Sequence, residues 1–345
     1  MISLAEKLCR DRRLTEAEFV CLLDERNDET ASFLVEAAVR ERKRVYGNDV
    51  YVRGLIEFSN FCKNDCLYCG IRRSNKRAER YRLSKEDILA RCREGHSLGF
   101  RTFVLQSGED PYYTPDRLAD IVASIKSEFP ECAVTLSVGE HPREVYALWK
   151  SAGADRYLLR HETADTEHYS RLHPSELTLE NRLRCLYDLK SLGYQVGCGI
   201  MVGSPYQTSR NIAKDLSFMK EFEPDMVGIG PFIPHHDTPF ADRARGSLDL
   251  TLYLLSIVRI MLPTVLLPAT TALGSIHPEG RELGILAGAN VCMPNLSPSE
   301  VKSKYNLYDG KLSTGSESAE CLAELTGRMN KIGYNVALVR GDVKK

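Results

Sequence analysis

Three cysteines lie within eight residues of one another, in the segment Cys62-Lys-Asn-Asp-Cys66-Leu-Tyr-Cys69. Cysteine thiolates bind soft metal ions, so a tight cluster of thiols in a polar segment indicates a metal centre. A structural zinc site takes four ligands, usually as two C-x2-C pairs, and the sequence has no second pair. Three thiolates on a 4Fe-4S cluster leave one iron free to bind a substrate or cofactor. The cysteine count therefore favours an iron–sulfur cluster over zinc or a disulfide.

Most of the other cysteines are isolated in apolar surroundings, where cysteine behaves as a small core residue. We interpret this set in that way: Cys9, Cys21, Cys92, Cys132, Cys185, Cys198 and Cys292.

Charge and hydropathy limit the possible partners. The 345 residues carry 46 Lys and Arg against 47 Asp and Glu, so a net charge of -1 gives no electrostatic reason to expect nucleic acid or an anionic membrane. No stretch has 18 consecutive apolar residues, and the N-terminus resembles no signal peptide. We therefore expect a cytoplasmic protein without a membrane span.

The elements that must hold the cysteines follow an alternating pattern. Helices are predicted to start at Ser84, Thr114 and Pro142, and to cover 179–192, 208–222, 248–262 and 280–288. Between them lie short apolar runs with strand character: 52–58, 102–106, 133–138, 156–160, 195–201, 226–229, 265–269 and 290–293. Eight strands that alternate with helices predict an α/β fold, a (β/α)8 TIM-type barrel. An open doubly wound sheet is the alternative, because alternation does not show closure.

Three regions are expected along the chain: an N-terminal helical extension over 1–50, the barrel over 51–300, and a C-terminal segment over 301–345, partly helical, that covers the barrel. The basic stretch 40–44 is interpreted as a solvated helix end. The three cysteines come directly after the first predicted strand. Active sites of such barrels lie at the carboxyl ends of the strands, so the cysteines occupy the expected position.

With Tyr68 directly before the third cysteine, the C-x3-C-x2-C motif resembles the signature of the radical S-adenosylmethionine (SAM) enzymes. The resemblance implies that Cys62, Cys66 and Cys69 hold one 4Fe-4S cluster and that SAM chelates the free iron. An electron from the reduced cluster then cleaves SAM to methionine and a 5'-deoxyadenosyl radical. The motif does not indicate the substrate.

Further segments resemble one branch of this superfamily, the FeFe-hydrogenase maturases called HydE. They are 56–60, 105–113, 135–140, 155–163, 225–234, 268–271 and 293–295. This resemblance implies action on a cysteine-bound Fe(CO)2(CN) precursor of the di-iron subcluster, with the maturases HydG and HydF as partners. Two alternatives stay open. One is a paralogue, or a relative of methylornithine or biotin synthase, that acts on a small amino acid or thiol; the other is a non-enzymatic zinc-bound module.

Strand four supplies charges that could meet a ligand. Arg156, Arg160 and Glu162 are separated by even numbers of residues, so we expect all three to face the barrel interior. Buried charges need each other or an ionic ligand, and two arginines suit an anion. A structural ion-pair network is the competing interpretation.

The resemblance also implies roles for individual residues. Gln106-Ser-Gly-Glu109 would form the turn that receives the ammonium group of SAM, with Gly108 allowing close backbone approach. The implied cofactor-binding set is Tyr68, Gln106, Ser107, Glu109, Thr135, Glu162, Arg182, Met201, Met226 and Ile233. The implied substrate-binding set is Arg53, Arg156, Thr270, Thr271 and Tyr305, and the implied catalytic pair is Arg160 and Tyr308.

One feature departs from the family. Many HydE proteins carry a second cluster site near the C-terminus, but the comparable positions here are Ser313, Cys321 and Glu324. One thiol cannot hold a cluster, so a single 4Fe-4S site is predicted.

Overall fold

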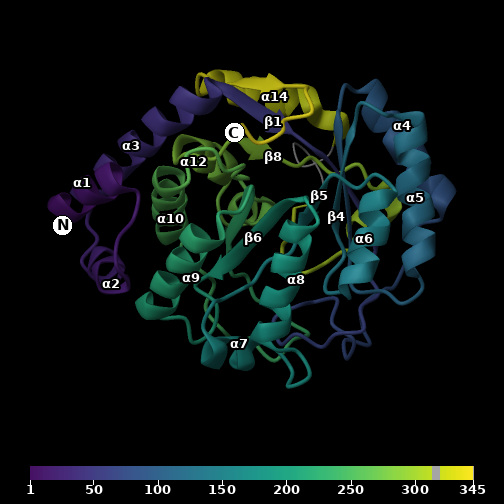
Figure 1. Cartoon of the computed structure of the whole chain (residues 1–345), viewed down its shortest axis with the longest axis horizontal. Coiled ribbons are helices and arrows are strands. Elements are labelled where there is room, and N and C mark those ends of the chain that lie inside the picture. The colour runs from purple at the N-terminus through teal and green to yellow at the C-terminus, as the bar shows by residue number, and fades with distance from the viewer. Residues whose placement is uncertain (313–318, 345) are drawn as a thin grey trace.

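The computed structural model describes residues 1–312 and 319–344, and its centre is a parallel sheet surrounded by helices (Figure 1). The sheet has the order β2-β3-β4-β5-β6-β7, with every neighbouring pair parallel. Its strands are β2 Gly54–Ser59, β3 Thr102–Ser107, β4 Ala133–Ser137, β5 Arg156–Leu158, β6 Gln195–Val202 and β7 Met226–Pro231. The helices that connect or cover them are α4 Lys85–Ser97, α5 Pro115–Glu128, α6 Arg143–Ser151, α7 Thr166–Leu172, α8 Leu179–Ser191, α9 Ser209–Phe222 and α10 Leu248–Met261. The side chains of Ser84 and Thr114 cap α4 and α5, as predicted.

The two edges of this sheet are joined by the chain after α10, so the barrel closes. Single parallel bridges connect Met226 to Leu266, Pro268 to Val291, and Leu55 to Asn295. These links run from β7 through two extended segments back to β2. The TIM-type barrel predicted from the sequence is confirmed, and the open-sheet alternative is wrong.

Several of the predicted strands are shorter than expected: β5 ends at Leu158 instead of residue 160, and the last two predicted strands lose most of their regular pairing. The run 265–269 makes isolated bridges and hydrogen bonds on both sides but no regular ladder. Pro268 lies in its middle and has no backbone N–H to donate, which explains the interrupted pairing. The last predicted strand shrinks to β8, Val291–Cys292, because Pro294 follows at once.

The first predicted strand is divided at Arg53. β1, Asp49–Val52, leaves the barrel sheet and pairs with β8 and with β9, Asn335–Ala337, in a small parallel sheet. β2 continues in the barrel and leads into the cysteine segment.

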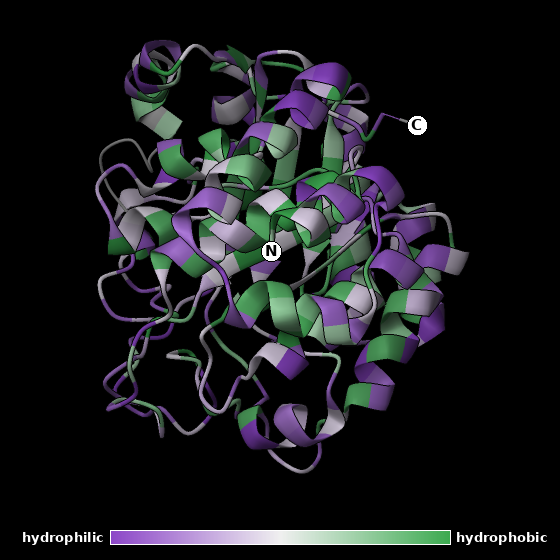
Figure 2. Ribbon diagram, turned by 90° about the vertical axis from the view of Figure 1, so that its left-hand side faces the viewer, coloured by the Kyte–Doolittle hydropathy of each residue, from purple (hydrophilic) through white to green (hydrophobic). Residues whose placement is uncertain are grey.

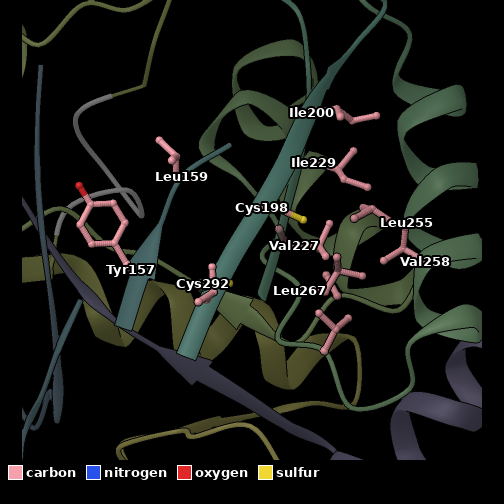
Figure 3. Packing of buried hydrophobic residues seen from close by; sticks show 14 of the residues in the cluster. Tyr157, Leu159, Cys198, Ile200, Val227, Ile229, Leu255, Val258, Leu267 and Cys292 are labelled. Carbon is pink, nitrogen blue, oxygen red and sulfur yellow. The ribbon is translucent and has the colours of Figure 1, made fainter. Parts of the chain in front are cut away.

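The core lies between the barrel strands and the outer helices. In Figure 3, Ile200 and Ile229 on the strands point toward Leu255 and Val258 on α10. Colouring by hydropathy shows the apolar residues gathered inside, with polar residues on the outer faces of the helices (Figure 2). α10 is buried on all sides, because the N-terminal helices pack on its outer face.

The N-terminal region is helical, as predicted, with α1 Ile2–Asp11, α2 Glu16–Asp24 and α3 Asp28–Tyr46. The interpretation of 40–44 as a solvated helix end is wrong for Arg42. Its guanidinium is buried and donates to the carbonyl oxygens of Ala289, Gly47 and Asp49. Arg42 thus ties α3 to the barrel wall.

Two short helices, α11 Thr271–Ile276 and α12 Gly280–Leu286, precede β8. The chain after β8 contacts both ends of the barrel. Its elements are α13 Ser299–Lys302, the 3-10 turn η2 Ala319–Cys321 and α14 Leu322–Lys331. Tyr305 contacts Gln106 at the carboxyl end of β3, whereas the carbonyl oxygen of Arg340 accepts a bond from Thr102 at the start of β3. In the described part of the chain, no helix combines the length and apolarity needed to cross a membrane.

Candidate active site

The cysteine segment is a long loop that leaves the carboxyl end of β2 and returns at α4. Neighbouring loops fix it through backbone hydrogen bonds: Lys63 N donates to Glu109 O at 2.9 Å, and Leu67 N donates to Leu172 O at 3.0 Å. Gly70 N donates to Leu307 O at 2.9 Å. The loop is therefore anchored to the ends of β3 and α7 and to the C-terminal segment.

All three thiols of this loop are partly buried, and burial raises the pKa of each. The pKa of Cys69 reaches about 12. Three thiolates together are thus unfavourable here without a positively charged group to bind them. The donor set fits a metal centre.

The distances between the three sulfur atoms help to distinguish a zinc site from an iron–sulfur cluster. Around one zinc ion, ligand sulfurs bound at about 2.3 Å lie roughly 4 Å apart. Among the described residues, ligand atoms all within 4.8 Å of one another occur in two groups, neither of which contains Cys62, Cys66 or Cys69: His96, Glu131 and Cys132; and His235, His236 and Asp309. The three thiols are spread more widely than one zinc ion requires, as ligands of separate irons would be.

Beside the loop, a cavity of about 330 Å³ opens at the carboxyl ends of the strands. Tyr68 and Cys69 contribute to its wall from the loop. The other predicted site residues that line it are Gln106, Ser107, Arg160, Glu162, Arg182, Met201, Ile233, Thr270, Thr271, Tyr305 and Tyr308. The structure thus brings together residues from β3, β6, α8, α11 and the C-terminal segment, which lie more than 200 positions apart.

Arg160 and Glu162 follow β5 and face each other across the cavity wall, with Arg160 Nη2 3.5 Å from Glu162 Oε2. Glu162 has a φ of 64°, a backbone conformation that is costly for a residue with a side chain and that concentrates at functional sites. Arg160 Nε, Glu162 Oε2 and Thr270 Oγ1 are buried and have no hydrogen-bond partner within the described residues. Such groups are costly unless a ligand satisfies them, so they fit a polar molecule bound in this cavity.

Arg182 reaches the cavity from α8 and is held by two acceptors. It donates to Glu140, and its Nη1 donates to the carbonyl oxygen of Arg160 at 2.6 Å. This guanidinium is therefore a fixed cation at the cavity wall. Its field lowers the pKa of Cys66, although burial outweighs it.

Tyr68 is oriented by His173, whose pKa burial lowers to about 3, so the imidazole is neutral. His173 Nδ1 lies 3.0 Å from the carbonyl oxygen of Tyr169 and must donate to it, because a carbonyl oxygen only accepts. His173 Nε2 consequently accepts from the Tyr68 hydroxyl at 3.2 Å. The ring before the third cysteine is thus fixed at the cavity.

The turn after β3 supports the loop from behind. Glu109 does not line the cavity; its carboxylate accepts from Glu140 N at 2.9 Å and pairs with Lys63 Nζ at 3.1 Å. A Cβ at Gly108 would lie 2.3 Å from Phe61 O and 2.7 Å from Cys62 Cβ. Gly108 thus allows the turn and the cysteine loop to touch.

The expectation that Arg156 meets a ligand together with Arg160 and Glu162 is wrong, because Arg156 lies at a different height in the barrel. Arg156 Nη2 pairs with Asp342 at 2.6 Å, and Nη1 donates to Thr102 at 3.2 Å, both at the amino end of the strands. Side-chain alternation gives the face but not the height: four residues of strand span roughly 13 Å. Arg156 is therefore part of a structural network at the opposite end of the barrel.

Three other predicted site residues also lie outside the cavity wall. Arg53 Nη1 contacts the sulfur of Met226 at 3.1 Å, where β2 and β7 begin. Met226 packs among Tyr46, Tyr51, Leu266 and Val291, so its predicted place at the cofactor is not supported by its position. Thr135 is buried in β4, opposite Arg156 in the strand register. Of the positions compared with a second cluster, Ser313 lies outside the described residues.

Glu57 and Lys311 line the cavity although the sequence did not single them out. Lys311 Nζ lies 2.7 Å from Glu57 Oε1, and their side chains are 9% and 1% exposed. Asn295 Nδ2 donates to the other carboxylate oxygen at 2.8 Å. Glu57 could have been noticed in the sequence as a single carboxylate within a largely apolar strand. Nothing in the sequence indicated Lys311 as its partner, because the two residues are 254 positions apart.

Comparison with known proteins agrees with this site. A sequence model described as the radical SAM superfamily matches residues 56–219. The FeFe hydrogenase maturase subunit HydE of Thermotoga maritima is 50% identical over 301 residues, 86% of this chain and 86% of that protein. The chain belongs to the radical SAM superfamily. Within that superfamily it is HydE-like.

Two further similar proteins are both methylornithine synthases. 3-Methylornithine synthase of Methanosarcina barkeri is 32% identical over 90% of this chain and 87% of that protein. The crystal structure of methylornithine synthase (PylB) has a TM-score of 0.83 and 28% identity, covering 97% of both chains. The barrel and its N- and C-terminal extensions are thus shared with the PylB structure.

Proposed function

We propose that this radical SAM enzyme acts in the maturation of FeFe hydrogenase, on a cysteine-bound Fe(CO)2(CN) precursor of the di-iron subcluster. The observation that carries the proposal is the 50% identity to HydE over 86% of both chains. Identity at that level and coverage supports a shared reaction more strongly than the 32% identity to 3-methylornithine synthase.

Bound together, one 4Fe-4S cluster on Cys62, Cys66 and Cys69 and a molecule of SAM supply a 5'-deoxyadenosyl radical. The residues of the protein hold the cluster and SAM, orient the substrate, and shield the radical from water. The turn at Gln106 and Ser107 offers oxygen atoms to the ammonium group of SAM. Glu109 lies behind this turn, so its cofactor role rests on family resemblance alone. Glu162 accepts hydrogen bonds from the ribose hydroxyl groups of SAM, since its Oε2 is buried and has no hydrogen-bond partner among the described residues. Arg182 binds the carboxylate of SAM.

The remaining cofactor contacts are apolar or polar groups around the same cavity. Met201 and Ile233 provide apolar surface for the adenine, and Tyr68 covers the side toward the cluster. Thr135 and Met226 lie deeper in the barrel, and their cofactor roles rest on family resemblance alone.

The substrate occupies the part of the cavity bounded by Arg160, Thr270, Thr271, Tyr305 and Tyr308. Arg160 and Tyr308 stand nearest the reacting atoms. An arginine with an unsatisfied Nε and a threonine with an unsatisfied hydroxyl suit an anionic or cyanide-bearing ligand. Arg53 lies outside the cavity wall, but its Nε and Nη2 are buried without a hydrogen-bond partner among the described residues, so we keep it as a second position for an anionic group. Arg156 is excluded from this set, since Asp342 already neutralises it.

The proposed partners are HydG, as the source of the precursor, and HydF, as the receiver of the product. The cytoplasm is the proposed compartment, because the cluster needs a reducing environment.

The decisive experiment is anaerobic reconstitution followed by incubation with SAM, a reductant and the HydG product. We expect about four irons per chain, formation of 5'-deoxyadenosine, and consumption of the organometallic precursor. The Cys62→Ala variant should lose the cluster. Cys21→Ala, which removes an exposed cysteine from α2, is the matched control and should keep it.

Two results would overturn the proposal. One bound zinc and no iron would remove the radical chemistry altogether. An intact cluster that cleaves SAM but leaves the HydG product unchanged would remove the proposed substrate.

The second candidate is a synthase that acts on a small amino acid. It is favoured by the likeness to methylornithine synthase in both sequence and structure. The same reconstituted enzyme, supplied with the twenty protein amino acids instead of the organometallic precursor, would then form methylornithine or another rearranged amino acid, detected by mass spectrometry.

A further inference from the structure

Arg80 lies behind the cysteine loop and binds its backbone at four points. Its Nη1 donates to the carbonyl oxygens of Asn60 and Ile71, the latter at 2.8 Å. Its Nη2 donates to the carbonyl oxygens of Arg72 at 2.7 Å and Asn75 at 3.1 Å. One guanidinium thus joins the start of the loop, before Cys62, to the turn that follows Cys69.

The fork geometry explains why this position carries arginine. A planar guanidinium presents several donors in fixed directions, whereas a lysine ammonium cannot reach carbonyls on two separate strands of a loop in the same way. Backbone carbonyls in a tight, partly buried loop need donors that the loop itself does not supply. Arg80 provides them.

Arg80 differs from the other partly buried cations of the loop in its charge balance. Within the described residues it has no ion pair, a condition that it shares in this loop only with the exposed Lys76. The other basic residues of the loop are paired with carboxylates: Lys63 with Glu109, Arg72 with Asp65, Arg73 with Glu176, Arg77 with Asp237, and Arg82 with Asp110. The charge of Arg80 is therefore free to act on other groups.

The cysteines are the groups on which this charge acts. The carbonyl oxygens that Arg80 binds flank these ligands, since Asn60 lies two residues before Cys62 and Ile71 lies two residues after Cys69. The guanidinium is therefore held beside both ends of the cysteine motif. In a poorly solvated loop such an interaction is stronger than at an exposed surface.

We propose that Arg80 is a positioning residue for the iron–sulfur cluster, which fixes the shape of the cysteine loop and raises the reduction potential of the bound cluster. Reduction adds one negative charge to the cluster, and an unpaired cation nearby stabilises that state. Net charge and hydrogen bonding around a cluster are among the factors that set its potential. The inference rests on the proposed single 4Fe-4S site.

Two substitutions separate the two effects. Arg80→Met removes both the charge and the donors, whereas Arg80→Lys keeps the charge and loses the fork. Arg73→Met is the matched control, because it removes an exposed cation of the same loop that pairs with Glu176. Each protein is reconstituted anaerobically, its iron is counted, and its midpoint potential is measured by redox titration monitored by electron paramagnetic resonance.

We expect a midpoint potential more negative than wild type for Arg80→Met and close to wild type for Arg80→Lys. Both Arg80 variants should release iron to a chelator faster than wild type, and Arg73→Met should match wild type in both measurements. An Arg80→Met cluster with the wild-type potential and iron retention overturns the proposal. If Arg80→Met holds no iron, Arg80→Gln replaces it, and a wild-type potential in that variant overturns the electrostatic part. Failure of the wild-type protein to bind iron would instead contradict the proposed function.

Discussion

Gly108 offers the sharpest test of how the turn after β3 supports the cysteine loop. In Gly108→Ala, the added methyl group would lie 2.3 Å from Phe61 O and 2.7 Å from Cys62 Cβ. Both distances are below 3.0 Å, the closest approach that Cβ atoms normally make to other heavy atoms. The carbonyl of Phe61 must therefore move by at least about 0.7 Å. Neither contact is with the free end of a side chain, so a change of rotamer cannot relieve it.

Two consequences follow from this movement. Overpacking of this kind costs about 1–3 kcal/mol of stability. Because Cys62 directly follows Phe61, the same movement displaces a cluster ligand. Disturbing the groups that support metal ligands typically lowers metal affinity by about 10–100-fold.

The assay compares melting temperature in the cluster-free protein with iron retention in the reconstituted protein under a chelator. We expect a melting temperature lower by a few degrees and a faster loss of iron. The control is Gly327→Ala in α14, where an added Cβ meets no atom within 4 Å; alanine should there stabilise the helix by up to about 1 kcal/mol. A Gly108→Ala protein with wild-type melting and iron retention would refute the reasoning.

Three further outcomes are expected. The pKa of Asp342 lies at about 2, lowered by its bonds to Arg156, so its stabilising effect is complete above about pH 4 and lost toward pH 2; Asp342→Asn should lower the melting temperature at pH 7 and leave it unchanged below pH 2. Lys311→Met leaves the carboxylate of Glu57 buried without its cation and should cost about 3–5 kcal/mol in thermal unfolding, partly restored by adding Glu57→Gln. Glu162→Gln should weaken SAM binding by about 10–100-fold in calorimetry while the iron content stays at the wild-type value.

The strands that the sequence predicted well are those with uninterrupted apolar residues. β3, β4, β6 and β7 begin at the predicted residues and are buried along most of their length, so each carries a largely apolar run. β5 also begins at the predicted Arg156 but ends two residues early. The run 265–269 has the same composition but contains Pro268, and its pairing is reduced to bridges. The apolar composition of 265–269 predicted an extended segment in the barrel wall. The missing backbone N–H of Pro268 explains why this segment forms no regular hydrogen-bonded ladder.

The candidate site could be predicted where one local rule applied. The rule that ligands gather at the carboxyl ends of barrel strands places the cysteine loop, Gln106 and Arg160 at one cavity, and the structure agrees. The ion pair between Glu57 and Lys311 could not be found in this way, because its members are brought together only by closure of the whole barrel.

Arg156 and Arg160 show what distinguishes a structural charge from a ligand-binding one. Both belong to the segment at β5, but the side chain of Arg156 is fully buried whereas that of Arg160 is 31% exposed at the cavity. Arg156 is neutralised by Asp342, which the tail of the chain delivers to the amino end of the barrel. Arg160 keeps a buried Nε without a partner beside a carboxylate oxygen in the same condition. Because an unsatisfied buried group costs free energy, these atoms beside a cavity are best explained by a ligand that completes them there. Arg53 also has buried nitrogens without a hydrogen-bond partner among the described residues, but it lies away from the cavity. The combination of an unpartnered polar atom with a cavity therefore identifies the functional end of the barrel.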